Sequence, residues 1–176
     1  DNVETMVAIS NAVLLGRPVM SRIITITGDG ISHPAHYEVL TGTNVEELVQ
    51  AAGGLKDNVK KVISGGPMMG FAMFDLHVPC TKTSSALLCM AEDPASESEA
   101  TACINCGRCV KVCPGHVMPS RLATLAEHGD LEGFQKMDGM ECCECGCCSY
   151  ICPAKRPLTQ SIKSMRKIVL ANRRKK

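Results

Sequence analysis

Apolar positions in the first half of the chain change from helical to strand-like spacing. Over 2–16 they recur on one face and predict a helix, which ends at Gly16. The β-branched run Arg22–Thr27 predicts a strand, and Gly28-Asp29-Gly30 after it predicts a hairpin turn. Residues 37–40 fit the returning strand.

One helix and two further strands complete this region. Glu46 and Glu47 follow Asn44, and acidic residues are favoured in the first turn of a helix by its dipole. Gly53-Gly54 ends that helix, and the runs 59–63 and 85–88 predict strands. A small mixed sheet crossed by one helix, of the β-grasp type, is therefore expected over 21–91.

The pattern turns helical in the second half. Residues 92–102 combine alanine, serine and proline with acidic side chains, and predict a solvated linker or a loosely packed helix. From 103 to 176 the pattern predicts helices that begin at Pro119 and Pro157, with a short one over 130–137 between them. The expected fold class is α+β, with an α-helical domain after the β-grasp domain.

Composition narrows the function classes. The 176 residues suit one or two small domains. A net charge of +1 gives no indication of a strongly charged partner. No apolar run approaches the length of a membrane span. The five histidines are scattered, and no nucleophile–base pair is apparent, so no bond-making chemistry is expected.

Two copies of one cysteine phrase carry the chemistry. Residues 103–114 and 142–153, which start 39 positions apart, both read C-x2-C-x2-C-x3-C-P. In such a run three cysteines hold one [4Fe–4S] cluster and the fourth binds the other cluster. Gly107 and Gly146 permit the tight loop that wraps three thiolates around one cluster.

Alignment of the two copies predicts two clusters with crossed ligands. One is expected on Cys103, Cys106, Cys109 and Cys152, and the other on Cys142, Cys145, Cys148 and Cys113. Cys143 and Cys147 could shift the register of the second phrase. They align with Ile104 and Arg108, however, and so are expected to be packed thiols. Cys80 and Cys89 lie outside both phrases and are expected to be small buried hydrophobic residues, a redox role being the alternative.

Disulfides and zinc are the competing interpretations. Disulfides suit small secreted scaffolds, whereas no signal peptide precedes these cysteines and the rest of the chain can form a core. Structural zinc sites use paired CxxC elements, but here three cysteines follow in succession with a fourth before proline. Iron–sulfur clusters in a reducing compartment, most simply the cytosol, are favoured.

A glycine-rich turn, 64–70, lacks the lysine of a phosphate-binding loop and the dinucleotide fingerprint. A tight connection between strands is the expectation. The basic tail, which comprises Arg166-Lys167 and residues 173–176, could meet anionic lipid or an acidic partner, although a solvated helix end is the simpler interpretation.

Together these motifs resemble one family. The opening Asp1-Asn2-Val3-Glu4-Thr5, the segment Ala51-Ala-Gly-Gly-Leu55, the turn Ile63-Ser-Gly-Gly-Pro-Met-Met-Gly70 and the doubled cysteine phrase are similar to the C-terminal portion of the C subunit of the Rnf electron-transport complex. The resemblance implies an SLBB-type β-grasp domain over 21–91 and a two-cluster ferredoxin domain over 103–176. It also implies that 1–20 is the end of a flavin- and NADH-binding domain, in which Asn2 and Thr5 would lie near the flavin.

The resemblance implies a relay function. In the longer parent, FMN would take hydride from NADH, and the two [4Fe–4S] clusters would pass single electrons to or from membrane subunits. The parent would be a peripheral component on the cytoplasmic side of the bacterial membrane and part of an ion-translocating oxidoreductase. A cobalamin reductase of similar domain order and a zinc-stabilised binding module are the alternatives. Near-neutral charge and few aromatic residues argue against nucleic acid as a partner.

Overall fold

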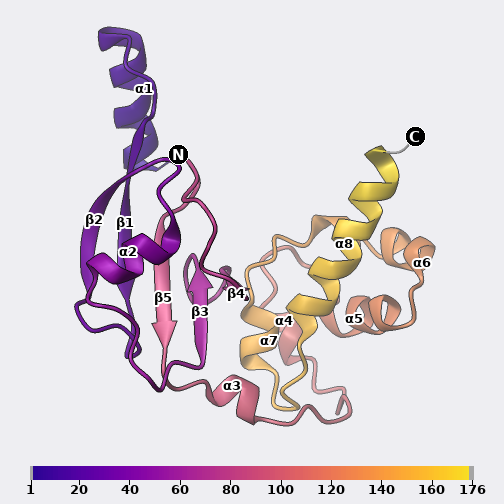
Figure 1. Cartoon of the computed structure of the whole chain (residues 1–176). Helices are drawn as coiled ribbons and strands as arrows, with labels where there is room; N and C mark the ends of the chain where they lie inside the picture. The colour runs from indigo at the N-terminus through magenta and orange to yellow at the C-terminus, as the bar shows by residue number, and fades with distance from the viewer. Residues whose placement is uncertain (1, 175–176) are drawn as a thin grey trace. The chain divides into compact units, whose positions relative to one another are not determined.

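The computed structural model describes residues 2–174, and its chain divides into two compact units, one ending at Asp93 and the other beginning at Pro94. Asp1, Lys175 and Lys176, parts of the opening motif and of the basic tail, lie outside the described residues. The first unit contains a sheet, and the second is helical (Figure 1). The expected α+β class is confirmed.

The first unit is built on a five-stranded sheet within the described residues, in the order β2-β1-β5-β3-β4. Its central pair, β1 and β5, is parallel, and the other neighbouring strands are antiparallel. The strands are β1 (Ser21–Thr27), β2 (Ala35–Leu40), β3 (Lys61–Ser64), β4 (Phe71–Met73) and β5 (Ala86–Met90). β1 and β2 form the expected antiparallel pair, whereas β4 was not anticipated because its three residues carry no alternating pattern.

Helix α2 (Val45–Ala51) lies against the sheet and closes the core (Figure 1). The Asn44 side chain accepts a hydrogen bond from the Glu46 N–H at 3.0 Å and so caps the helix. Val49 and Leu48 pack with strand residues such as Ile26, which is completely buried. Alternate residues of the central strands point into this core, as a sheet with one covered face requires.

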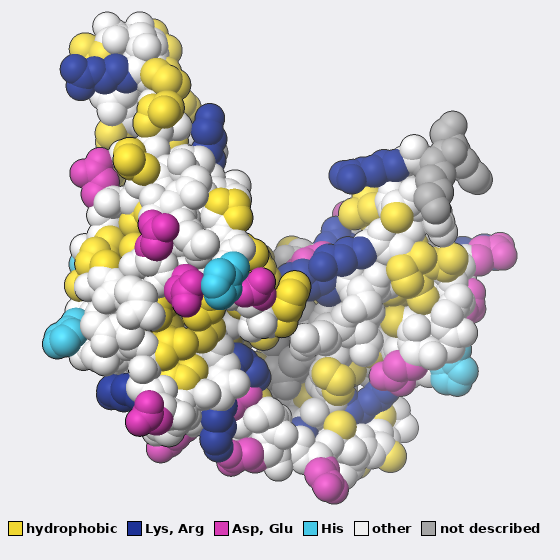
Figure 2. Space-filling model, viewed as in Figure 1, with side chains coloured by type: hydrophobic (Ala, Val, Ile, Leu, Met, Phe, Trp, Pro, Cys, Tyr) yellow, Lys and Arg dark blue, Asp and Glu magenta, His cyan; other side chains and the backbone are white. Residues whose placement is uncertain are grey.

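Helix α1 (Val3–Leu15) precedes the sheet and buries none of its residues. Figure 1 shows it extending beyond the end of β1, and Figure 2 shows apolar side chains along its visible face. Asn2 caps it by accepting from the Glu4 N–H at 3.0 Å, and Glu4 pairs with Arg22 of β1 at 2.9 Å.

The turn after β1 also forms hydrogen bonds with the end of the first unit. The Asp29 carboxylate accepts the backbone N–H groups of Ala91 and Glu92, at 2.9 and 3.0 Å. These bonds hold the chain beyond β5 against the turn, and Lys61 of β3 adds an ion pair with the buried Asp93.

The second unit consists of short helices around one long helix. They are α3 (Pro94–Glu97), α4 (Arg108–Lys111), α5 (Pro119–Glu127), α6 (Leu131–Lys136), the 3-10 turn η1 (Gly139–Glu141), α7 (Cys147–Ile151) and α8 (Leu158–Arg174). Phe134 and Leu122 pack against Ile162 and Met165 of α8 in its main apolar core. α3 shows that the expected linker is partly helical. No helix of residues 2–174 has both the length and the apolar character of a membrane span.

The glycine-rich turn joins β3 to β4, as the sequence predicts. A Cβ atom on Gly70 would lie 2.5 Å from the Gly66 carbonyl oxygen and 2.8 Å from that of Ser64. Gly70→Ala should therefore lower the free energy of unfolding of the first unit by about 1–3 kcal/mol, the usual cost of overpacking. Denaturation read through hydrogen exchange in β3 and β5 measures it. Gly66→Ala is the matched control, since no atom lies within 4 Å of its Cβ, and equal losses in both variants would contradict this account.

His77 gives the first unit a pH dependence. Its ring contacts Asp75 at 2.9 Å and Glu46 of α2 at 2.8 Å, and these acids raise the pKa of His77 above 6.5. The charged ring stabilises the fold below the unfolded pKa, and this contribution is lost as pH rises through the folded pKa. The stability difference between the wild type and His77→Gln should accordingly shrink between about pH 6 and about pH 8. Thermal unfolding across that range checks it, and a constant difference would refute it.

Candidate metal centre

The two cysteine phrases adopt the same backbone conformation. In the first, Asn105 and Gly107 have φ angles of 53° and 71°, and in the second Glu144 and Gly146 have 57° and 83°. These left-handed residues curl each loop, and a short helix follows each curl. The helix is α4, from Arg108, in the first copy and α7, from Cys147, in the second, and the two starts are 39 positions apart. Gly107 and Gly146, which the sequence predicts to lie in tight loops, are therefore both left-handed.

The structural repeat continues past the cysteines. His116 and Lys155, again 39 residues apart, both have a φ of 52°. α5 then begins at Pro119 and α8 at Leu158, with the same separation. The repeating unit is therefore a loop, a short helix, a turn and a longer helix.

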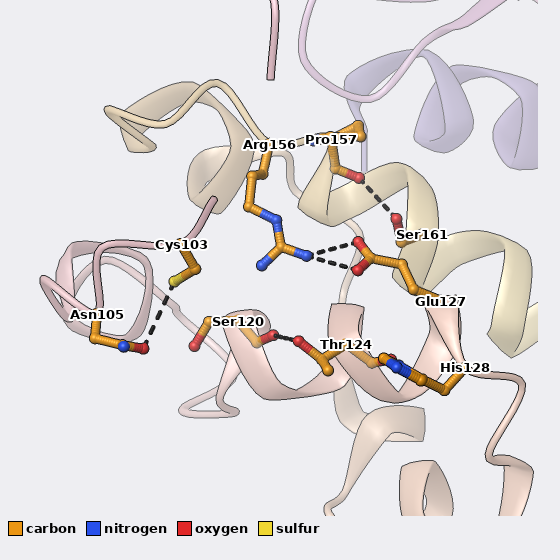
Figure 3. Close-up of polar contacts among 9 residues, drawn as sticks. All are labelled: Cys103, Asn105, Ser120, Thr124, Glu127, His128, Arg156, Pro157 and Ser161. Carbon is orange, nitrogen blue, oxygen red and sulfur yellow. Dashed lines mark hydrogen bonds and ion pairs between the residues drawn. The ribbon is translucent and has the colours of Figure 1, made fainter. Parts of the chain in front are cut away.

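A cavity of about 110 Å³ is lined by the four cysteines of one predicted site. Its walls include Cys103, Cys106 and Cys109 of the first phrase together with Cys152, the last cysteine of the second. Ser120 and Arg156 also line it, and Figure 3 shows Arg156 beside Cys103 and Ser120. The fold thus brings a cysteine of the second phrase to the loop of the first.

The remaining predicted ligands gather in the second loop and the main core of the unit. Cys142, Cys145 and Cys148 lie near one another, since, in addition to burial, a charge on Cys148 raises the pKa of Cys142 and a charge on Cys145 raises that of Cys148. Cys142 and Cys113 pack against the same apolar cluster, which contains Val117 and Phe134. Across residues 2–174, no three histidine, cysteine or acidic side chains converge as ligands of a single metal ion.

The cysteines outside the predicted ligand sets differ in exposure. Cys143 is exposed, so the expectation that it is a packed thiol was wrong, while Cys147 is partly buried. Cys143 follows the extended residue Cys142 in a loop without regular structure, which leaves its side chain outside the core. Cys80 and Cys89 are buried in the sheet core, and burial raises the pKa of Cys89 to about 11.

Burial also governs the second loop. Burial raises the pKa of the Cys142 thiol. Two groups oppose this rise: the Glu144 N–H, which donates to Cys142 Sγ at 3.4 Å, and the positive charge of Arg166. Burial likewise raises the pKa of Cys148, opposed by the Thr159 hydroxyl at 3.2 Å. A negative ligand such as a metal-bound thiolate gains from these donors.

Two arginines lie at the two loops, in contacts that the sequence did not predict; Arg156 was not singled out, and Arg166 was named only as part of the basic tail. Arg156 donates from Nη2 to both carboxylate oxygens of Glu127, at 2.7 Å each (Figure 3). Arg166 of α8 pairs with Glu144 and donates from Nη2 to the Met140 carbonyl oxygen at 3.1 Å. Their partners are 22 or more positions away, so no local pattern in the sequence could reveal them.

Two family models match the chain in the same order as its units. Residues 23–72 match the SLBB domain, and residues 96–153 match the 4Fe-4S dicluster domain.

Curated relatives extend the match over most of the chain. It is 38% identical over 174 residues to the C subunit of the Na(+)-translocating ferredoxin:NAD(+) oxidoreductase complex of Acetobacterium woodii, covering 99% of this chain and 39% of that protein. It is 42% identical over 126 residues to the C subunit of the proton-translocating ferredoxin:NAD(+) oxidoreductase complex of Clostridium ljungdahlii (72% of this chain, 28% of that protein). The C subunit of the ion-translocating oxidoreductase complex of Rhodobacter capsulatus is 40% identical over 160 residues (91% and 31%). The chain thus spans well under half the length of these relatives.

Proposed function

Because the chain belongs to the family of C subunits of ion-translocating oxidoreductase complexes, we propose that its second unit holds two [4Fe–4S] clusters and relays single electrons. The observation that carries this proposal is the cavity that joins Cys103, Cys106 and Cys109 to Cys152. Three thiols from one phrase and a fourth from the other are the donor set of a crossed two-cluster site.

The second cluster is assigned to Cys142, Cys145, Cys148 and Cys113. Its support is the matching backbone of the two loops and the packing of Cys113 and Cys142 against one apolar cluster. Cys143 and Cys147 occupy the positions of Ile104 and Arg108 in the repeat, and are left out of the ligand set.

The donor set fits clusters better than zinc. A structural zinc site closes around one ion with four ligands at about 2.3 Å. Here the fourth thiol comes from a different phrase and the four line a cavity, which suits a larger inorganic core. A bound [4Fe–4S] cluster supplies reversible one-electron chemistry, at a potential set by charge, hydrogen bonds and exposure.

The residues of the chain supply position and environment for that chemistry. Cys103 and Cys106 are exposed, so the first site faces solvent, whereas Cys142 and Cys145 are partly buried. The first site is thereby the more accessible one for exchange with a partner, and the second is shielded by α8 and its neighbours.

In the longer parent, the clusters would connect an FMN and NADH site outside the second unit with other subunits of the membrane complex. The relatives are named as components of ferredoxin:NAD(+) oxidoreductase complexes, which is the reaction such a relay would serve. We place the parent at the cytoplasmic side of the membrane as a peripheral subunit. No observation favours a cobalamin reductase or a zinc-stabilised module.

Iron analysis tests the proposal. Anaerobic reconstitution of the whole chain should give about eight irons per chain, with paramagnetic signals on reduction, since each of two cubanes contains four. Metal analysis combined with electron paramagnetic resonance measures both. Stoichiometric zinc uptake with no iron would contradict the relay.

Cysteine variants test the crossed assignment. Cys152→Ser should reduce iron content by up to about half and remove the signal of the cluster held by 103–109, while Cys113→Ser should do so for the cluster held by 142–148. Cys143→Ser and Cys147→Ser are matched controls from the same loop and should keep both clusters. If instead Cys152→Ser damaged the cluster of its own phrase, the ligands would not cross.

A further inference from the structure

The repeat places opposite charges at equivalent positions of the two halves. Glu127, the last residue of α5, lies 39 positions before Arg166 of α8. Asn105 lies 39 positions before Glu144, and both have left-handed backbones. A shared backbone thus supports a neutral loop residue and an acidic helix residue in the first half, and an acidic loop residue and a basic helix residue in the second.

Different partners complete these positions. Glu127 is paired with Arg156, so the ion pair at the first site consists of one cation and one carboxylate. Glu144 is paired with Arg166 and approached by Lys163 at 3.6 Å, which gives two cations and one carboxylate at the second. The side chains of Arg166 and Glu144 are only 19% and 23% exposed, so solvent screens this charge less than at an open surface.

Arg166 is held directly against the second cysteine loop. Its Nη2 donates to the Met140 carbonyl oxygen at 3.1 Å, just before that loop, and its Nη1 contacts Glu144 within it. The backbone N–H of Glu144 in turn donates to Cys142 Sγ at 3.4 Å. The guanidinium and a predicted ligand are therefore tied to the same residue of one tight loop.

One donor of Arg166 is left over. Of the side-chain nitrogen and oxygen atoms described in residues 2–174, Arg22 Nε and Arg166 Nε are buried without a hydrogen-bond partner. A buried donor without an acceptor destabilises the fold. The sulfur atoms of a cluster bound by the second loop would be acceptors close to the loop that Arg166 contacts. Arg22 lies in the first unit, away from any cysteine phrase in the sequence.

We propose that Arg166 is a positioning residue that raises the reduction potential of the cluster on Cys142, Cys145, Cys148 and Cys113, by its positive charge and its free Nε donor. The inference rests on the proposed function, since it requires that cluster. Reduction adds one negative charge to a cluster, and a nearby cation stabilises the more negative form. The different ion pairs beside the two loops thereby give similar clusters different potentials.

Potentiometric titration of the reconstituted whole chain, followed by electron paramagnetic resonance, tests this. Arg166→Met should lower the midpoint potential of one cluster, with an about tenfold change in its ratio of reduced to oxidised form at a fixed potential, or about 59 mV for one electron. Arg166→Lys, which keeps the charge but not the Nε donor, should give a smaller shift in the same direction. The other cluster should be unchanged.

Three further variants make the result decisive. Lys167→Met removes the same charge from the exposed neighbour on α8 and should shift neither potential. Arg156→Met should shift only the other cluster. Glu144→Gln removes a negative charge from the same loop and should move the Arg166-sensitive cluster to a more positive potential. If Arg166→Met fails to bind iron, Arg166→Lys is measured in its place, and an unchanged potential in that variant would overturn the role of the Nε donor.

The outcomes separate the two proposals. A wild-type chain that takes up no iron would overturn the proposed function itself. A chain with about eight irons in which Arg166→Met and Lys167→Met behave alike would overturn the role of Arg166 alone. If Arg156→Met and Arg166→Met shift the same signal, the assignment of Arg166 to the second cluster is wrong.

Discussion

The second unit depends on a backbone constraint that occurs twice. Each cysteine phrase must curl within a few residues, and it does so through two left-handed positions, Asn105 with Gly107 and Glu144 with Gly146. The short helix that follows each curl then directs the last cysteine of the phrase away from its own loop, and in the first site Cys152 arrives in place of Cys113. The helices α5 and α8 pack together through an apolar cluster that contains Leu122, Ile162 and Met165. The conformation of the two loops therefore determines where the cysteines of the unit lie.

The two cysteine loops share a backbone conformation but differ in their charged neighbours and in their exposure. The repeat that superposes the loops carries Glu127 in one half and Arg166 in the other, and each recruits an ion-pair partner from a different segment. Exposure differs as well, since Cys103 and Cys106 are open to solvent while Cys142 and Cys145 are partly covered. Charge and burial are the quantities through which a protein adjusts an iron–sulfur potential, so a duplicated motif can serve two different steps of one relay.

The first unit shows how far local pattern reaches. The β-branched run of β1, the acidic first turn of α2 and the tight glycine-rich turn after β3 were all predictable, because each is a short-range preference. β4 was missed because Phe71–Met73 is too short to show alternation, and it forms by pairing with β3. Cys143 was misplaced for a related reason, since exposure in an irregular loop follows from packing that no sequence spacing encodes.

The sequence by itself determined the doubled cysteine phrase, the glycines that permit its curl, and the order of a sheet-containing unit before a helical one. These follow from residue types and spacings, which act over a few positions of the chain. Only the tertiary structure decided that Cys152 lies in the cavity of the first phrase, that Arg156 meets Glu127, and that Arg166 grips the second loop. Those contacts join residues 22 or more positions apart, and they exist because helix packing brings the segments together.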